Sequence, residues 1–150
     1  MADPALGVRS YLLTATSTAI TSIIGSGTSA RFFPQDLPQA ATMPAVAYET
    51  ISDIPDHCIG AEWGRNGFSR ARIAIDCYAI TAAASRSLAR TIMAYLSGPT
   101  GRLRGVYGGV NFFDAMIDSS ARTEAESPTD GSDARRYVTT VDVIVSYYDE

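Results

Sequence analysis

Side chains suited to acid–base or metal chemistry are concentrated at Asp56, His57 and Cys58. His57 is the single histidine of the chain, which leaves few choices for a general acid or base. Neighbouring positions do not turn His and Cys towards one ion as an i, i+2 or i, i+3 spacing does. The sequence also has no second cluster of Cys and His to complete four ligands. We therefore interpret this segment as a solvent-exposed loop and expect no metal ion and no other cofactor.

Motifs for nucleophilic or phosphate chemistry are missing as well. The sequence GSGTS at 25–29 does not match the G-x-S-x-G nucleophile elbow, and a P-loop needs a lysine, which this sequence lacks. Asp114 and Asp118 fall on one face of a predicted strand, where we favour a solvated surface over a pair of catalytic carboxylates. We expect no catalytic residues and predict that the protein is not an enzyme.

The composition favours one globular domain over residues 1–150. Hydrophobic residues make up 46% and charged residues 19% of the chain, and the net charge is −4. Paired arginines such as Arg70 and Arg72 are isolated and form no basic patch, so we expect no sequence-specific binding of nucleic acid. No apolar run has the length of a membrane span and we see no signal peptide. We expect a protein made in the cytoplasm, with no membrane partner and with Cys58 and Cys77 reduced.

Hydrophobic spacing predicts one long amphipathic helix over residues 4–24. An Asp-Pro pair provides the N-cap signal, and Leu6, Leu13 and Ile20 recur at intervals of seven. A Gly-Ser-Gly sequence follows and should end the helix. The Thr- and Ser-rich middle has weak helix propensity, so we expect packing to hold this helix together.

Period-two alternation predicts that most of the remaining chain forms strands. We expect a short extended segment at 31–34, strands at 45–52, 69–80, 110–122 and 137–148, and loops at 55–68 and 123–134. A second helix should run from a cap at Thr81 to Leu96. The expected fold class is α+β, a mostly antiparallel sheet with two main helices packed on one face. The expected core consists of Leu13, Ile20, Ile73, Ile75, Leu88, Ile92, Val141, Val143 and Val145.

The last predicted strand raises the question of what covers it. Its odd positions from Tyr137 to Tyr147 are mostly apolar, whereas its even positions are mixed. An edge or face left open by such a strand is useful in a closed ring, where each subunit offers the same surfaces to the next. We expect a neighbouring subunit to cover the second face or the edge of this sheet.

Two loops combine apolar anchors with charges that can set the register of a contact between subunits. The candidate interface residues are Trp63, Arg65, Phe68, Glu124, Glu126, Asp130, Asp133, Arg135 and Arg136. The two arginines are placed to form forked pairs with carboxylates of a neighbour. The alternative for Trp63, that it packs back onto its own sheet, has similar weight.

Taken in order, several segments resemble the tail-completion family of long-tailed phages. That family includes tail terminators similar in role to the lambda tail terminator, and it also occurs in prophages and gene-transfer agents. The resemblance covers nearly the whole chain and rests on order and spacing. The residues that carry it are Arg31, Pro34, Pro44, Tyr48, Ile75, Asp76, Tyr78, Ala79, Leu88, Leu96 and Asp142.

The resemblance implies a structural virion protein at the head–tail junction. Its expected form is a hexameric ring that caps the tail tube, ends tube growth and joins the tail to the head. The implied partners are the tail-tube protein and a head–tail connector protein, and DNA is able to pass through the ring. The segments 55–68 and 98–133 are longer than the compact core of the family. Two alternatives stay open: another head–tail joining or tail-tube protein and, less favoured, a small ligand-binding α+β domain.

Overall fold

Three long antiparallel strands form the centre of the protein in the computed structural model, which describes residues 3–14, 18–38, 41–56, 67–99, 101–118, 122–126 and 136–148. The helices are α1 (Pro4–Leu12), α2 (Thr18–Ile24) and α3 (Ala82–Ser97), and a 3-10 turn spans Gly27–Ser29. The strands are β1 (Phe32–Pro34), β2 (Ala45–Asp56), β3 (Phe68–Ala79), β4 (Gly101–Arg102), β5 (Gly105–Tyr107), β6 (Val110–Ile117), β7 (Arg122–Glu126) and β8 (Arg136–Tyr148).

In the described part of the chain, the sheet has seven strands in the order β1-β2-β3-β8-β6-β5, with β7 paired to β8 beside this path. Strands β3 and β8 pair along their whole length, from Phe68 opposite Tyr148 to Ala79 opposite Tyr137. Along its other edge, β8 pairs with β6 near its C-terminal end and with β7 near its N-terminal end. Of the described pairings, only β1 with β2 is parallel. The expected mostly antiparallel α+β fold is confirmed.

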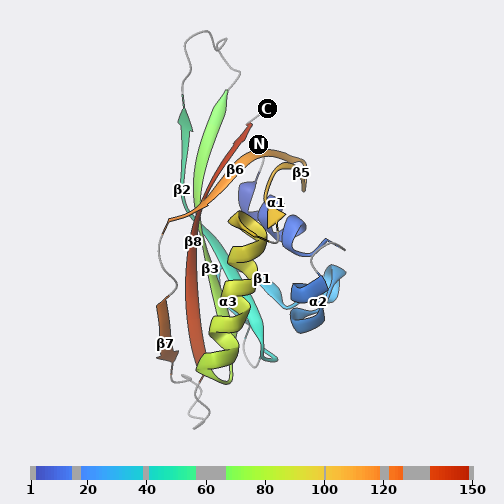
Figure 1. The fold of residues 1–150 in the computed structure, drawn as a ribbon, viewed down its shortest axis with the longest axis vertical. Coiled ribbons are helices and arrows are strands. Elements are labelled where there is room, and N and C mark those ends of the chain that lie inside the picture. Colours follow the sequence, from blue (N-terminus) through green and yellow to red (C-terminus); the bar gives the residue numbers. More distant parts are fainter. Residues whose placement is uncertain are drawn as a thin grey trace.

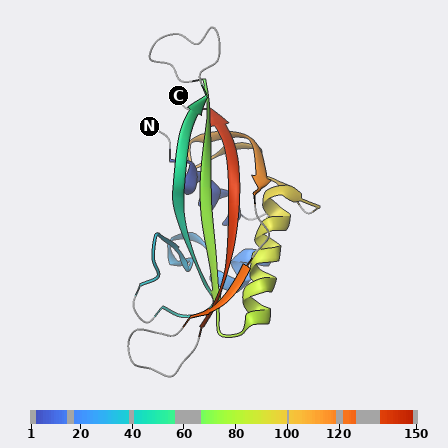
Figure 2. The ribbon, with the colours of Figure 1, turned by 90° about the vertical axis from the view of Figure 1, so that its left-hand side faces the viewer.

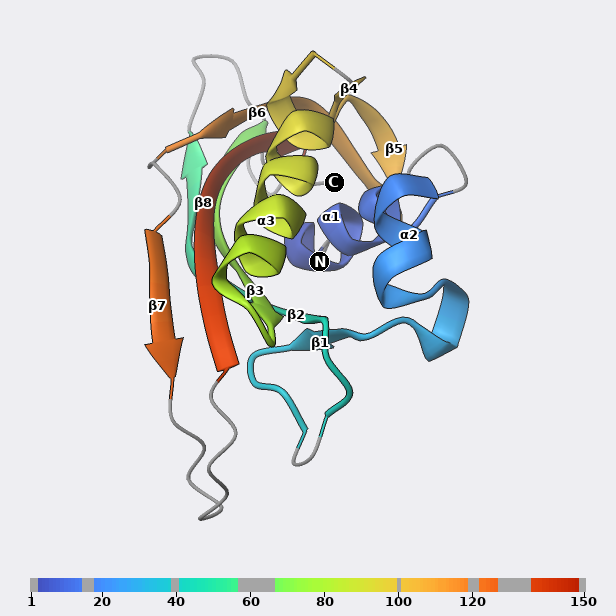
Figure 3. The ribbon, with the colours of Figure 1, turned by 60° about the horizontal axis from the view of Figure 1, so that its bottom comes forward.

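The helices lie on one face of the sheet, which Figure 1 shows edge-on at the left with α1, α2 and α3 at the right. Figure 3 shows α1 and α3 from the end of the sheet, both on its concave side. The alternation in β3 and β8 explains this layering, because every second residue points towards the helices and is buried. These residues are Ala71, Ile73, Ile75, Cys77, Ala79, Thr139, Val141, Val143, Val145 and Tyr147. The expected core is confirmed except for Leu13, which is only partly buried.

The prediction of a single helix over 4–24 is wrong. Helix α1 ends at Leu12, and α2 begins at Thr18. The repeat of seven therefore does not run through one helix, and Leu6 is 50% exposed. The buried side of α1 instead contains Val8 and Tyr11, whose hydroxyl donates a hydrogen bond to the Tyr95 carbonyl at 2.6 Å. Weak helix propensity in the Thr- and Ser-rich segment explains why packing decides where α1 ends.

Helix α3 follows the expectation closely. The Thr81 side chain accepts a hydrogen bond from the Ala84 amide at 3.2 Å and caps the first turn. Leu88, Ile92 and Leu96 are buried on its inner side. Gly98 ends the helix at a point where a Cβ atom would lie 2.6 Å from the Ala94 Cα, so only glycine fits there.

Some of the predicted strand boundaries are wrong, and one short strand was not predicted. The expected strand 110–122 is two strands, since β6 ends at Ile117, and β7 runs to Glu126 inside the expected loop 123–134. Strand β2 continues to Asp56, and β3 begins at Phe68, so both strands enter the expected loop 55–68. The short strand β5 was missed. It turns into β6 through Gly108 and Gly109, whose φ angles of 58° and 79° suit a two-residue hairpin.

Candidate interaction surface

The sheet face turned away from the helices, which we call the outer face, carries no described helix. Figure 2 looks directly at β2, β3 and β8 on this face. Directly opposite residues of antiparallel strands point to the same side of the sheet. The pairs Arg72 with Ile144 and Asp76 with Thr140 therefore lie on the outer face, as does Tyr148 opposite Phe68.

Three aromatic rings contact one another on the outer face near the C-terminal end of β8, one pair stacked and two pairs edge-to-face. The ring centroids of Phe68 and Tyr148 are 5.0 Å apart, those of Phe113 and Tyr148 are 4.0 Å apart, and those of Phe68 and Phe113 are 4.8 Å apart. A register shift between Phe112 and Asp114 explains how Phe113 reaches this group. Phe112 points inward and is 1% exposed, whereas Phe113 and then Asp114 both face outward.

Further exposed apolar side chains lie on the same face of the sheet. Ile54 and Met116 are 60% and 57% exposed, and Ile144 faces outward beside Met116 in the register. A hollow of about 630 Å³ is lined by Phe68, Arg70, Phe113, Asp114, Met116, Ile144 and Ser146. We call Ile54, Phe68, Phe113, Met116, Ile144 and Tyr148 the apolar patch. A contiguous exposed group of this kind usually marks a contact with another molecule.

Charged side chains border the apolar patch towards the middle of the sheet. Arg72 forms ion pairs with Asp118 and with Asp142, the latter at 3.4 Å. Asp76 accepts a hydrogen bond from the Thr140 hydroxyl at 2.7 Å. Asp114, inside the hollow, has no hydrogen bond or ion pair to any described residue. Asp114 and Asp118 share the outer face, but they are about 13 Å apart along the strand, too far to share a proton.

The edge formed by β2 is poorly suited to pairing with another strand. Strand β1 covers β2 only as far as Tyr48, and among the described strands the rest of β2 pairs with β3 alone. A register shift at Ile51 and a proline at Pro55 interrupt that open stretch. Bulges and prolines are devices that protect edge strands from pairing. The outer face is therefore a better candidate for a contact than this edge.

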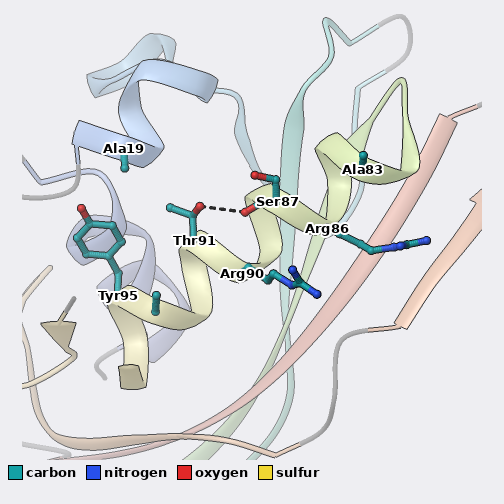
Figure 4. A pocket seen from close by; sticks show the side chains of 8 residues that line it. Ala19, Ala83, Arg86, Ser87, Arg90, Thr91 and Tyr95 are labelled. Carbon is teal, nitrogen blue, oxygen red and sulfur yellow. Dashed lines mark hydrogen bonds between the residues drawn. The ribbon is translucent and has the colours of Figure 1, made fainter. Parts of the chain in front are cut away.

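A second hollow lies on the opposite side of the molecule, between α2 and α3. It has a volume of about 540 Å³ and is lined by Ala19, Ala83, Arg86, Ser87, Arg90, Thr91, Ala94 and Tyr95. Figure 4 shows Arg86 and Arg90 projecting from α3, with Ala19 facing the helix from α2. We call it the helix groove. Arg86 donates a hydrogen bond to the Thr123 hydroxyl at 3.3 Å, whereas Arg90 has no partner among the described residues.

The structure describes only some of the predicted interface residues, and among those Phe68 and Arg136 lie far apart. Phe68 belongs to the apolar patch at one end of β8, whereas Arg136 lies at the other end, 5.0 Å above the Tyr78 ring. Glu124 pairs with the exposed Arg122 at 3.1 Å, and Glu126 ends β7 with its side chain outside the described part of the chain. The remaining predicted positions, which also lie outside the described residues, are Trp63, Arg65, Asp130, Asp133 and Arg135.

Sequence reasoning missed most of the apolar patch. The even positions of the last strand include Ile144 and Tyr148, and that alternation was the available signal. Their significance depends on Met116 and Phe113 lying beside them, which only the strand pairing shows.

The described residues offer little for catalysis. Burial raises the pKa of the Cys77 thiol, with a smaller contribution from Asp76, so this thiol stays protonated and is a poor nucleophile. No group of three His, Cys, Asp or Glu side chains in the described ranges is placed to hold a metal ion. His57 and Cys58 lie outside these ranges. In the same part of the chain, no helix is both long enough and apolar enough to span a membrane.

Comparison with known proteins gives a structural likeness only. No family model and no curated protein matches the sequence. By structure, the chain is similar to a chain of the virion of a native gene transfer agent particle, with a TM-score of 0.57 and 12% identity over 96% of each chain. A second solved structure aligns over 95% of this chain and 96% of its own, at 16% identity, but its TM-score of 0.40 is too low to support an argument. The chain thus shares its fold, from end to end, with a component of a gene transfer agent virion.

Proposed function

We propose that this protein is a structural component of a phage-like virion. The observation that carries the proposal is the likeness to a virion chain over 96% of both chains. The exposed apolar patch supports the same reading, because structural virion proteins function through contacts with their neighbours.

Within such a particle, the proposed role is that of a tail terminator. The protein forms a ring, of six copies by the resemblance noted above, on the last ring of the tail tube. The ring ends tube elongation and presents a surface to the head–tail connector protein. A closed ring needs two different surfaces on each subunit, and the outer face and the helix groove are unlike and lie on opposite sides of the chain. This role places the protein in the virion, at the head–tail junction, and requires no cofactor.

A tail-tube subunit is the second candidate. Strands β2 and β3 extend past the helices at one end of the sheet, as Figure 1 shows, and such a hairpin suits a subunit that stacks on the next ring. A terminator occupies one end of a tube, whereas a tube subunit recurs along its whole length. The two roles are therefore separable by position.

The experiment is to bind the purified, tagged protein to tail tubes isolated from the particle and to locate it by gold labelling in electron micrographs. Label at a single end of each tube is the expected result. Native mass spectrometry of the protein alone should show a closed ring that does not elongate. Label along the tube, or filaments of the protein alone, would identify a tube subunit. A protein that stays monomeric and binds no tube would contradict the proposal.

A further inference from the structure

The outer face and the helix groove have complementary charges. Helix α3 carries Arg86 and Arg90 and no acidic residue. Arg90 is exposed and has no partner among the described side chains. On the outer face, Asp114 is likewise exposed and without a described partner, beside the rings of the apolar patch. The helix groove and the hollow of the outer face thus each present a charge without a described partner, and these two charges are opposite.

The two surfaces are also complementary in side-chain size. Small residues line the helix groove beside Arg90, namely Ala19, Ala83, Ser87 and Ala94. The apolar patch carries large rings, and Phe68 and Tyr148 remain 37% and 38% exposed after stacking on each other. Aromatic side chains that enter a pocket lined by small residues are typical anchors of protein interfaces.

We propose that the partner of the outer face is a second copy of this chain, which places its helix groove on the apolar patch. Arg90 of one copy then pairs with Asp114 of the next. This inference deepens the proposed function and rests on it, because it assigns the contact that builds the ring. The sheet of each subunit lies against the helices of its neighbour, so each copy uses both surfaces once.

The geometry separates this arrangement from a two-fold dimer. The outer face and the helix groove lie on opposite sides of the subunit, as Figure 1 shows for the sheet and α3. Contact between unlike surfaces is heterologous, so it propagates from copy to copy and gives a ring when the rotation between neighbours closes and a filament when it does not. A two-fold dimer through the outer face would instead place Asp114 near its own copy and leave Arg90 unused.

Cross-linking tests the contact directly. In a Cys58→Ser background, where the remaining Cys77 is buried, the variants are Arg90→Cys, Asp114→Cys and the double variant. A short bismaleimide is used because an Arg–Asp pair holds its Cα atoms farther apart than the roughly 7 Å limit of a disulfide. The double variant should give a ladder of covalent multimers, and the mixture of the single variants should give dimers alone. Each single variant by itself should stay monomeric.

Charge reversal provides the second test. Sedimentation velocity measures self-association of each variant, first for the protein alone and then for the protein bound to isolated tails. Arg90→Glu and Asp114→Arg should each weaken self-association by about tenfold, and the double reversal should restore it. Arg102→Glu, an exposed arginine outside both surfaces, is the matched control and should change nothing. Circular dichroism should show all four variants folded, because neither Arg90 nor Asp114 has a described partner.

The outcomes distinguish this inference from the proposed function. Cross-linking of Asp114→Cys alone would show a two-fold contact and overturn the inference. A ring seen by native mass spectrometry without either cross-link or charge effect would also overturn it, while leaving the tail terminator role intact. If no ring forms and no gold label binds the tubes, both the proposed tail terminator role and this inference are contradicted.

Discussion

The Ser85 hydroxyl oxygen lies 2.6 Å from the Thr139 hydroxyl oxygen, and both side chains are fully buried. Ser85 donates its proton to the Cys77 carbonyl at 2.9 Å, so Thr139 must donate to Ser85. Thr123 then donates to Thr139, at 2.9 Å, and accepts from Arg86. The result is a directed chain of hydrogen bonds that starts at Arg86 on α3, passes through β7 and β8, returns to α3 at Ser85 and ends on β3. It fixes the helix groove relative to the outer face.

Replacing Thr139 by valine tests this chain of hydrogen bonds. Thr139→Val keeps the shape of the side chain but removes one donor and one acceptor, so it should lower the free energy of unfolding by about 1–3 kcal/mol. Urea denaturation of the wild type, Thr139→Val, Ser85→Ala and the double variant measures the coupling energy between the two sites. We expect a coupling energy above about 0.5 kcal/mol, and additive effects would show that the hydroxyls act independently.

Gly7 lies where α1 meets β6. A Cβ atom at this position would lie 2.6 Å from the ring of Phe112, which is itself buried. Glycine to alanine normally stabilises a helix by about 0.5–1 kcal/mol, whereas here the clash should reverse the sign and destabilise the protein by about 1–3 kcal/mol. Thermal unfolding measures the change. Leu6→Ala, at an exposed neighbour, is the control, and Phe112→Leu should recover part of the loss. A stabilising Gly7→Ala would contradict this packing.

Ile75 occupies the centre of β3 and is fully buried. Ile75→Ala should lower the free energy of unfolding by about 2–4 kcal/mol, because it leaves a cavity between the sheet and the helices. Ile54→Ala, at a 60% exposed position of β2, is the matched control and should change stability by less than about 0.5 kcal/mol. Equal effects at the two positions would mean that the inner and outer faces are assigned wrongly.

A separate experiment tests whether the loop residues predicted from the sequence contribute to ring assembly. Trp63→Ala, and separately the double reversal Arg135→Glu with Arg136→Glu, should leave the isolated chain folded but stop ring closure on the tube. Circular dichroism of each variant, together with tail length in particles assembled with it, is the measurement. Tails of normal length with heads attached would show that these loops do not contribute to assembly.

Much of the fold was predictable, because a sheet covered on one side imposes a strict alternation on its strands. That alternation gave the inward residues of β3 and β8 correctly. The end of α1 was not predictable from spacing, since tertiary contacts of Tyr11 compete with the repeat of Leu6 and Leu13. The Gly108-Gly109 hairpin had a readable signal, a glycine pair between apolar residues, that was missed.

The candidate surface was less predictable than the core. Phe113 faces outward because of a register shift, which period-two alternation does not reveal. The helix groove depends on α2 and α3 lying side by side, with Ala19 opposite α3. Interface residues on separate strands and helices become one surface only through pairing and packing.

The length of the tail tubes tests the central claim most directly. In a strain that produces the particle but lacks this gene, electron micrographs should show tubes of variable length without heads, because nothing ends their growth or joins them to the head. Supplying the wild-type protein should restore one length and attached heads. Tubes of uniform, normal length with heads attached in the strain that lacks the gene would contradict the account.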